Sequence, residues 1–268
     1  MGKLRLVMQS PVKDNYQTIE TLAIWSTLGF DDLCMFVSEN ENPIFIDVLT
    51  SKLPKVCIHQ IKIPLEYNHY EKRYSNSVTK ISSLGKKAGP NWLFFRILNE
   101  IYQDHKQEIF LLEPDVYPIN LENAANRIET DVLHNQDWWV IGAKPHLDIR
   151  KFISPSIHNH LNGAAFYKTD SEEFISFLNA IWLPSLLEGL IIDKNLAYDV
   201  LSDPKYRTVL SKSLQFYWDK YQNKFKESKL IINYSLLNID EKLLNELQEG
   251  VSSLFNKDSF SIHVKVRK

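Results

Sequence analysis

Short apolar runs alternate with amphipathic or polar segments along most of the chain. Four of these runs end at polar or proline-containing sequences, as buried strands do: Leu4–Met8, Leu33–Val37, Val56–Ile63 and Glu108–Leu112. Between the first two, apolar residues recur near helical spacing from Ile19 to Leu28 and stop at Gly29. Strands separated by helices are typical of crossover units. The pattern therefore predicts an α/β protein with a mainly parallel central sheet and flanking helices.

A second set of elements is expected after residue 88. Gly89-Pro90 opens a helix with an apolar stripe, because proline is favoured at the first helical position. Asp170 is expected to start another helix, since Glu173 three residues later completes a capping-box pattern. The other expected elements are strands at Trp138–Ala143, Gly163–Tyr167 and Leu230–Tyr234 and a helix at Asp240–Leu247. Residues 65–88 lack clear periodicity and are predicted to form a long surface loop.

The composition is that of a globular protein. Of the 268 residues, 44% are hydrophobic and 24% are charged, which excludes a disordered or fibrous chain. We expect a single domain over residues 1–268, with a core over about 1–201 and a C-terminal extension of helix and strand over 202–268. The 31 basic and 33 acidic side chains give a formal net charge of −2, so non-specific nucleic-acid binding has no global electrostatic support.

The cysteines and the N-terminal sequence bear on the cellular compartment. Cys34 and Cys57 lie within apolar runs, where a free cysteine usually packs as a small core residue. We therefore expect a reducing, cytoplasmic setting. No apolar stretch resembles a signal peptide or reaches the roughly 18 residues of a membrane span. Leu6 stands where a myristoylation motif needs Ser or Thr, so no anchor is expected.

The most informative segment is Phe110–Pro118, with the sequence FLLEPDVYP. Its apolar strand ends at Glu113 and Asp115, and Pro114 between them should stop strand pairing. Two residues apart in an extended chain, the carboxylates should project to the same side, at the sheet edge where α/β proteins bind ligands. Such oxygen ligands suit Mn²⁺ or Mg²⁺ when phosphate and water complete the coordination. Solvated acids that close a strand are an equal alternative.

The motif and its surroundings resemble the GT-A class of nucleotide-sugar glycosyltransferases, whose Asp-x-Asp motif holds a divalent ion on the donor diphosphate. The similarity runs from about residue 4 to 201 and includes GPNWLFFRIL before the motif and HLNGAAFY after it. Glu113 takes the first acidic place, an EPD form similar to that of some glycosyltransferase-like proteins of bacteria and viruses.

This resemblance implies a Rossmann-like, three-layer fold and a transferase activity. A sugar, such as a hexosyl or deoxyhexosyl group, would pass from a nucleoside diphosphate, with UDP expected, to the hydroxyl of a glycan or other acceptor. The class also implies a role in the synthesis of glycans such as surface polysaccharides.

By position, the resemblance also assigns contacts to the nucleotide. Gln9 and Ser10, after the first strand, would face the base, and Glu39, after the second strand, would lie near the base or the ribose.

Cationic and polar residues surround the start of the helix at Gly89-Pro90. Lys86 and Lys87 precede it and Asn91 lies in its first turn. Cations and a helix N-terminus both attract a diphosphate, so these residues are candidates for phosphate binding. Ordinary exposed lysines and a polar helix start are the alternative.

A sugar pocket is implied near the acceptor-side strand. The resemblance places Asn162, Gly163 and Ala164 there, where small residues let a sugar approach the backbone, and His146 could line the same pocket. Small core residues and a loop histidine without a role are the alternatives. The alternating histidines of residues 158–160 have no second ligand cluster at suitable spacing, so zinc is not expected there.

An inverting transfer needs a carboxylate that takes the proton of the acceptor hydroxyl. Glu188, Asp193 and Asp199 follow the acceptor-side strand at the place where the resemblance puts this base. Asp199 is preferred, because it interrupts an apolar stretch, whereas Asp193 is explained as a helix N-cap. A solvated helix face is the alternative for Asp199, and a retaining transfer needs no such base.

One departure from the class keeps other functions open. Where many metal-dependent members have a histidine ligand near the C-terminus, this chain has Asn233, with His263 further on. A non-catalytic carbohydrate- or nucleotide-binding relative is therefore one alternative. A sugar nucleotidyltransferase is another, although the Gly-rich, basic sequence expected after its first strand is missing. Basic residues over 220–229 and 265–268 could touch a membrane surface, but solvated charges are the simpler explanation.

Overall fold

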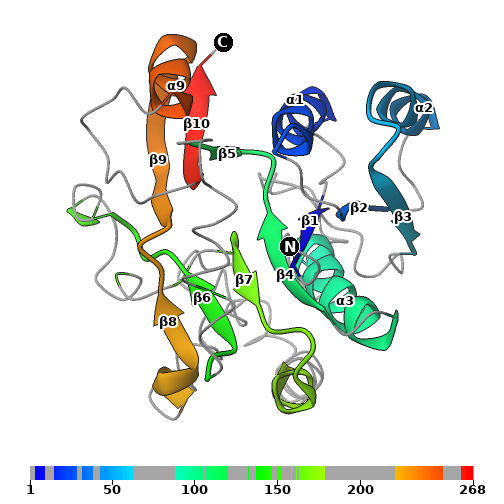
Figure 1. The fold of residues 1–268 in the computed structure, drawn as a ribbon, viewed down its shortest axis with the longest axis vertical. Coiled ribbons are helices and arrows are strands. Elements are labelled where there is room, and N and C mark those ends of the chain that lie inside the picture. The colour runs from blue at the N-terminus through cyan, green and yellow to red at the C-terminus, as the bar shows by residue number, and fades with distance from the viewer. Residues whose placement is uncertain are drawn as a thin grey trace, which may run out of the picture.

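The computed structural model of the chain describes 14 stretches and single residues that together contain both sheets and the helices that cover them (Figure 1). They are residues 4–9, 15–28, 32–38, 43–62, 88–104, 107–119, 132, 137–146, 150–151, 158, 161, 163–178, 221–249 and 261–267. No helix in these stretches is long and apolar enough to cross a membrane.

Seven strands form the central sheet in the order β3-β2-β1-β4-β7-β6-β8. Their bounds are β1 Leu4–Gln9, β2 Leu33–Ser38, β3 Cys57–Ile61, β4 Glu108–Leu112, β6 Val140–Gly142, β7 Ala165–Tyr167 and β8 Phe225–Glu227. The strands β3, β2, β1 and β4 are parallel, β7 is antiparallel to both of its neighbours, and β8 is parallel to β6. The predicted α/β class with a mainly parallel central sheet is confirmed.

Helices cover both faces of this sheet and give three layers. One hydrophobic cluster joins β1, β2 and β4 to α1 (Asn15–Ser26) and α2 (Pro43–Lys52). A second cluster, on the other face, joins the same strands to α3 (Ala88–Asp104) and to the helix at residues 172–178. The alternation of side chains along each strand explains the division, because Leu6 and Met8 belong to the first cluster and Val7 to the second.

A smaller sheet of three strands, in the order β5-β10-β9, lies beside the central one (Figure 1). It consists of β5 Val116–Pro118, β9 Ile231–Asp240 and β10 Ser261–Arg267, and α9 (Glu241–Gln248) packs on it. β10 lies between the other two, antiparallel to β5 and parallel to β9. The C-terminal part of the chain thus reaches the turn that follows β4.

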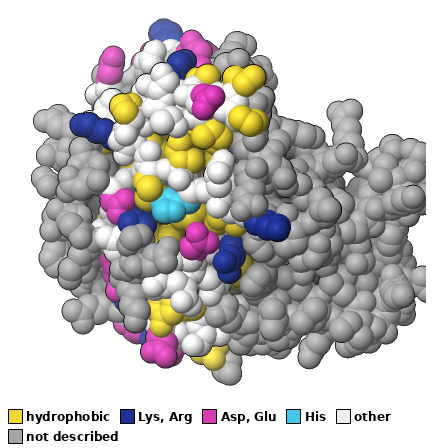
Figure 2. All heavy atoms as spheres, turned by 90° about the vertical axis from the view of Figure 1, so that its right-hand side faces the viewer, with side chains coloured by type: hydrophobic (Ala, Val, Ile, Leu, Met, Phe, Trp, Pro, Cys, Tyr) yellow, Lys and Arg dark blue, Asp and Glu magenta, His cyan; other side chains and the backbone are white. Residues whose placement is uncertain are grey.

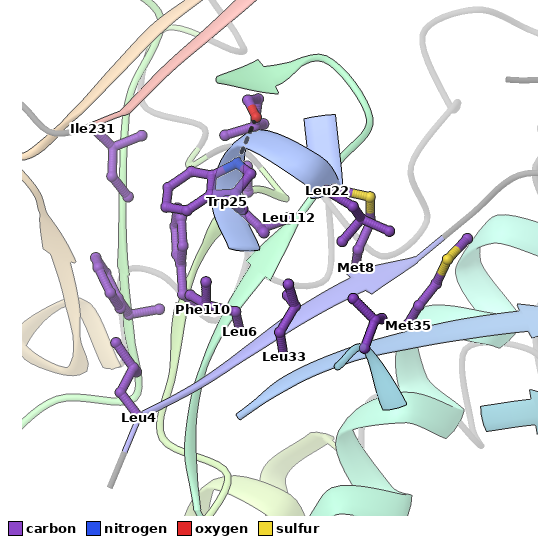
Figure 3. Packing of buried hydrophobic residues seen from close by; sticks show 14 of the residues in the cluster. Leu4, Leu6, Met8, Leu22, Trp25, Leu33, Met35, Phe110, Leu112 and Ile231 are labelled. Carbon is purple, nitrogen blue, oxygen red and sulfur yellow. Dashed lines mark hydrogen bonds between the residues drawn. The ribbon is translucent and has the colours of Figure 1, made fainter. Parts of the chain in front are cut away.

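The aromatic core lies directly behind that turn. Trp25 of α1 is fully buried and meets Phe110 of β4 edge-on, with ring centroids 5.7 Å apart (Figure 3). Phe110 in turn stacks on Phe166 of β7 at 4.6 Å. This packing ties α1 to the middle of the sheet and fixes the place where β4 ends.

Several elements differ from those predicted. Strand β4 has the predicted bounds, whereas helix α2 and strands β5, β8 and β10 were not expected. The helix expected to begin at Asp170 begins two residues later, at residue 172. The Ser171 hydroxyl accepts the Phe174 N–H at 3.3 Å and so acts as its cap, while Asp170 pairs with Lys168 at 3.6 Å. The predicted loop at 65–88 lies almost wholly outside the described residues.

Candidate functional site

Three predicted site residues meet at the carboxyl edge of the central sheet. The parallel register of β1 and β4 pairs Met8 with Leu112, so its next step puts Gln9 beside Glu113. The antiparallel register of β4 and β7 pairs Phe110 with Phe166, and its continuation puts Glu113 opposite Gly163. Gln9, Glu113 and Gly163 therefore form one row across the strand ends, where open α/β sheets bind ligands.

The carboxylate of Glu113 lies directly over Gly163. A Cβ atom added to Gly163 would be 2.7 Å from Glu113 Oε1, which is closer than two such atoms can approach. Any side chain at position 163 would have to move the Glu113 carboxylate, because the carboxylate occupies the space that the side chain would fill. The sequence analysis explained the small residue by the room that a sugar needs and did not predict the contact with Glu113.

Tyr167 lies near this carboxylate and contacts the glycine beneath it. Its hydroxyl donates a hydrogen bond of 2.8 Å to the Gly163 carbonyl, which holds the backbone beneath Glu113. Burial raises the pKa of the Tyr167 phenol, and the negative charge of Glu113 raises it further. Tyr167 is thus a neutral hydrogen-bond donor at physiological pH.

The second acid, Asp115, lies in a tight turn and not in an extended segment. The Val116 N–H donates to the Glu113 carbonyl at 3.0 Å, which closes a four-residue turn with Pro114 at its second position. The expectation that both acids project from an extended chain is therefore wrong, because proline at that position favours a turn. Both side chains remain partly exposed at the sheet edge.

Helix α1 holds this turn from behind. The Thr21 hydroxyl donates to the Pro114 carbonyl at 2.7 Å. The Trp25 indole N–H donates to the Val116 carbonyl at 3.0 Å, and Figure 3 shows this bond as a dashed line. Both bonds are buried, and such bonds contribute about 1 kcal/mol each. Neither residue was predicted from the sequence, because polar atoms within an amphipathic helix give no signal of what they contact.

The negative charge of Asp115 also affects Tyr117, a residue of the smaller sheet. The hydroxyl of Tyr117 accepts a hydrogen bond from the Gln17 side-chain amide at 3.1 Å. Burial raises the pKa of the Tyr117 phenol, and the nearby negative charge of Asp115 adds to this rise. On the neighbouring strand, His263 is paired in register with both Val116 and Asn233. Strand β10 thus lies between β9 and the residue that follows Asp115.

Gln9, the last residue of β1, has a buried side-chain oxygen. Its side-chain oxygen Oε1 is buried and has no hydrogen-bond partner among the described residues. Buried polar atoms are nearly always paired, so this oxygen is a natural contact for a bound ligand or an ordered water.

Two further predicted residues lie on the same side of the sheet. His146 follows β6, and its ring lies 4.3 Å from that of Tyr234, with Nε2 3.4 Å from the Tyr234 hydroxyl. The backbone N–H of His146 donates to the Asn233 carbonyl at 3.0 Å. Ala164 is fully buried in the cluster beneath α1.

The other predicted site residues lie outside the described residues or are described only in part. Asn91 lies in the first turns of α3, and only its backbone is described. The remaining ones are outside the described stretches: Ser10, Glu39, Lys86, Lys87, Asn162 and Asp199.

No known protein family and no curated protein matches this sequence. Solved structures that are similar to this chain share little sequence with it. A glycosyltransferase involved in glycosylation of the major capsid of PBCV-1 is 10% identical over 97% of this chain and 92% of its own, with a TM-score of 0.43.

Two further matches have comparable scores. Core-mannan synthase A from Aspergillus fumigatus, in a Mn/GDP form, is 11% identical over 85% of this chain and 73% of its own, with a TM-score of 0.44. A 4-diphosphocytidyl-2C-methyl-D-erythritol synthase is 11% identical over 80% of this chain and 100% of its own, with a TM-score of 0.40. Identities this low transfer no activity to the chain.

A Gly163→Ala substitution tests the contact between the glycine and the Glu113 carboxylate. The added methyl group would displace the carboxylate, which is the flexible end of its side chain, so the fold should persist. If Glu113 binds Mn²⁺ together with a nucleotide, Gly163→Ala should weaken that binding about tenfold or more, because loss of a residue that positions a metal ligand costs about 10- to 100-fold in affinity. Titration calorimetry measures this change.

The control for this experiment is the same substitution in a Glu113→Ala background. There the methyl group meets no carboxylate, so Gly163→Ala should have no further effect on binding. Equal losses in both backgrounds would show that Gly163 acts without Glu113.

Proposed function

We propose that the chain is a divalent-metal-assisted glycosyltransferase that moves a sugar from a nucleoside diphosphate to a hydroxyl acceptor. The observation that carries the proposal is the row of Gln9, Glu113 and Gly163 at the carboxyl edge of the sheet, with Asp115 in the turn that follows. In the described part of the chain, the buried side-chain oxygen of Gln9 in this row has no hydrogen-bond partner, which supports a bound ligand at this edge.

The residues at this edge fit a hard divalent cation. Glu113 and Asp115 supply carboxylate oxygens, the ligand type that Mg²⁺ and Mn²⁺ prefer, and both are partly exposed. When bound, such a cation would neutralise negative charge on the leaving diphosphate. We propose His263 for a third protein contact, since β10 brings its backbone beside the residue after Asp115, whereas Asn233 lies one strand further away, on β9.

Other residues of the chain would bind and orient the substrates. Gln9 and Ser10 would contact the base, and Glu39 the base or the ribose. Lys86, Lys87 and Asn91 would receive the diphosphate at the start of α3, where the helix N-terminus favours negative charge. Asp199 would take the proton of the acceptor hydroxyl in an inverting reaction.

The sugar pocket, the donor and the setting complete the proposal. Asn162, Gly163, Ala164 and His146 would line the side that receives the sugar. We propose UDP as the donor nucleotide and a hexosyl or deoxyhexosyl group as the sugar, transferred to a glycan such as a surface polysaccharide. The setting would be cytoplasmic, and the basic residues over 220–229 would allow peripheral contact with a membrane.

Thermal stability with a panel of nucleotides tests the proposal first. Each nucleoside di- and monophosphate is added with and without Mn²⁺ or Mg²⁺, because a ligand that binds only the folded state stabilises it by about 2.7 kcal/mol at 100 times its Kd. We expect one diphosphate, UDP, to raise the melting temperature only when the metal is present. A shift without metal, or with a monophosphate alone, would contradict the metal role of Glu113 and Asp115.

Turnover separates the enzyme from its two rivals. Release of nucleoside diphosphate from a nucleotide sugar, in the presence of acceptors, is expected of the transferase and not of a binding protein. Formation of a nucleotide sugar from a triphosphate and a sugar phosphate would instead identify a nucleotidyltransferase.

A further inference from the structure

Two cysteines and a histidine meet on β2 and β3, toward the amino ends of these strands and away from the carboxyl ends where Glu113 lies. Cys34 is the second residue of β2 and Cys57 the first of β3, and the two are register partners in this parallel pair. His59 lies two residues after Cys57 and therefore on the same face of the strand. In the described part of the chain, this is the one group of three potential ligand side chains close enough to share a metal ion.

The ligand atoms are already near the spacing that a metal requires. The two sulfurs and a ring nitrogen all lie within 4.8 Å of one another, and Cys57 Sγ is 3.2 Å from His59 Nε2. Tetrahedral zinc, with bonds of about 2.3 Å to sulfur and about 2.0 Å to nitrogen, holds such atoms roughly 3.5 to 3.8 Å apart. Small side-chain adjustments would therefore bring all three atoms to coordinating positions.

We propose that Cys34, Cys57 and His59 bind one Zn²⁺ ion that joins the edge strand β3 to β2. Two thiolates and an imidazole bind zinc better than they bind the hard cations expected at Glu113 and Asp115. Three protein ligands leave a fourth position for water on the side where Cys57 is exposed. Figure 2 views the molecule from the side of α2 and β3, where a histidine side chain reaches the surface among hydrophobic and charged groups.

The charges around the site balance when zinc is bound. The two thiolates neutralise the dication, and the nearby Asp32 carboxylate is already paired with Arg5 at 2.6 Å. Asp32 also lies 3.4 Å from Cys34 Sγ, as the acceptor of its thiol proton. Because zinc binds the thiolate form of cysteine, zinc binding must displace that proton, which then appears in solution.

The histidine ring is held in place without the metal. It stacks on Phe36, its register partner on β2, with ring centroids 4.7 Å apart and planes inclined by 13°. A ring fixed by packing loses little freedom when it coordinates, which favours affinity. Because β3 pairs with β2 alone among the described strands, an ion that links these two strands would anchor this side of the sheet.

The zinc site is independent of the proposed nucleotide site. Cys34 and Cys57 lie at the amino ends of their strands, whereas Glu113 and Asp115 follow the carboxyl end of β4. Failure of the zinc site would therefore leave the glycosyltransferase proposal intact, and the reverse also holds.

Metal titration of the reduced protein tests the inference. We expect one equivalent of Zn²⁺ to bind with release of at least one proton per ion, and Co²⁺ in its place to give thiolate-to-metal charge-transfer absorption. Cys57→Ser and His59→Gln should each weaken Zn²⁺ binding about tenfold or more, and Cys57→Ser should abolish most of the cobalt–thiolate band. Cys57 is exposed, so its replacement should leave the fold intact.

Two control variants identify the site. His158→Gln removes a histidine that lies elsewhere and bonds the Arg150 carbonyl, and it should leave zinc binding unchanged. Asp115→Ala should preserve the cobalt spectrum. Absence of cobalt–thiolate absorption, or equal zinc affinity in the Cys57→Ser variant, would overturn the proposal.

Discussion

Asp115→Ala is expected to abolish metal-dependent nucleotide binding while leaving the fold intact. Loss of a residue that only supports a metal ligand already costs about 10- to 100-fold in affinity, so loss of a direct ligand should cost at least about a hundredfold. The stability effect should be small, because the side chain is partly exposed and lies outside the hydrophobic clusters. Calorimetric titration with Mn²⁺ and UDP measures the binding loss, and thermal unfolding without ligand measures stability.

The matched control is Asp47→Ala on α2. Asp47 is also an exposed acid of the described chain, but it lies on a helix away from the turn after β4. It should change neither nucleotide binding nor stability beyond about 0.5 kcal/mol. Full nucleotide binding by the Asp115→Ala protein would move the metal site away from this turn and remove the main support for the proposed activity.

Strands β1, β2, β4, β6 and β7 of the central sheet could be predicted because they are buried on both faces. A strand such as β4 consists almost wholly of apolar residues, so it stands out from its neighbours in the sequence. The same argument fails for α2, whose stretch after Pro43 mixes buried Phe45 with exposed residues such as Ile44. Its helical character depends on packing against the sheet, which periodicity over ten residues does not reveal.

The small sheet could not be predicted, because its strands are far apart in the chain. β5 has three residues and its partner β10 begins at Ser261, so nothing local indicates that the two pair. The consequence for the site is direct. The sequence places His263 far from the acidic motif, whereas the register of β10 brings its backbone beside the residue that follows Asp115.

The structure links Gly163 and Glu113 in a way that the sequence did not indicate. Gly163 and Glu113 were selected separately, as a small pocket residue and as a metal ligand. The structure makes them one unit, because the Glu113 carboxylate occupies the space that a side chain at 163 would fill. Cys34 and Cys57 show the opposite case: each was interpreted as a core residue, and only the parallel register of β2 and β3 joins them with His59.

Asp199→Asn is expected to stop transfer while sparing donor binding. A positioned general base contributes about 10²- to 10⁴-fold to a proton transfer, so the transfer rate should fall by that factor. Affinity for Mn²⁺ and nucleotide should stay within about twofold, because a base that meets the acceptor does not touch the donor diphosphate. Single-turnover transfer and calorimetric titration separate the two effects.

Two substitutions and the product stereochemistry decide between Asp199 and the alternatives. Asp193→Asn should keep full transfer activity, because an asparagine caps a helix about as well as an aspartate. Glu188→Gln should do the same if Asp199 is the base. An Asp199→Asn protein with an unchanged transfer rate would exclude Asp199. A product that retains the anomeric configuration would explain that outcome, because a retaining transfer requires no such base. The carboxylates at Glu113 and Asp115 would keep their role in either case, because they act on the donor.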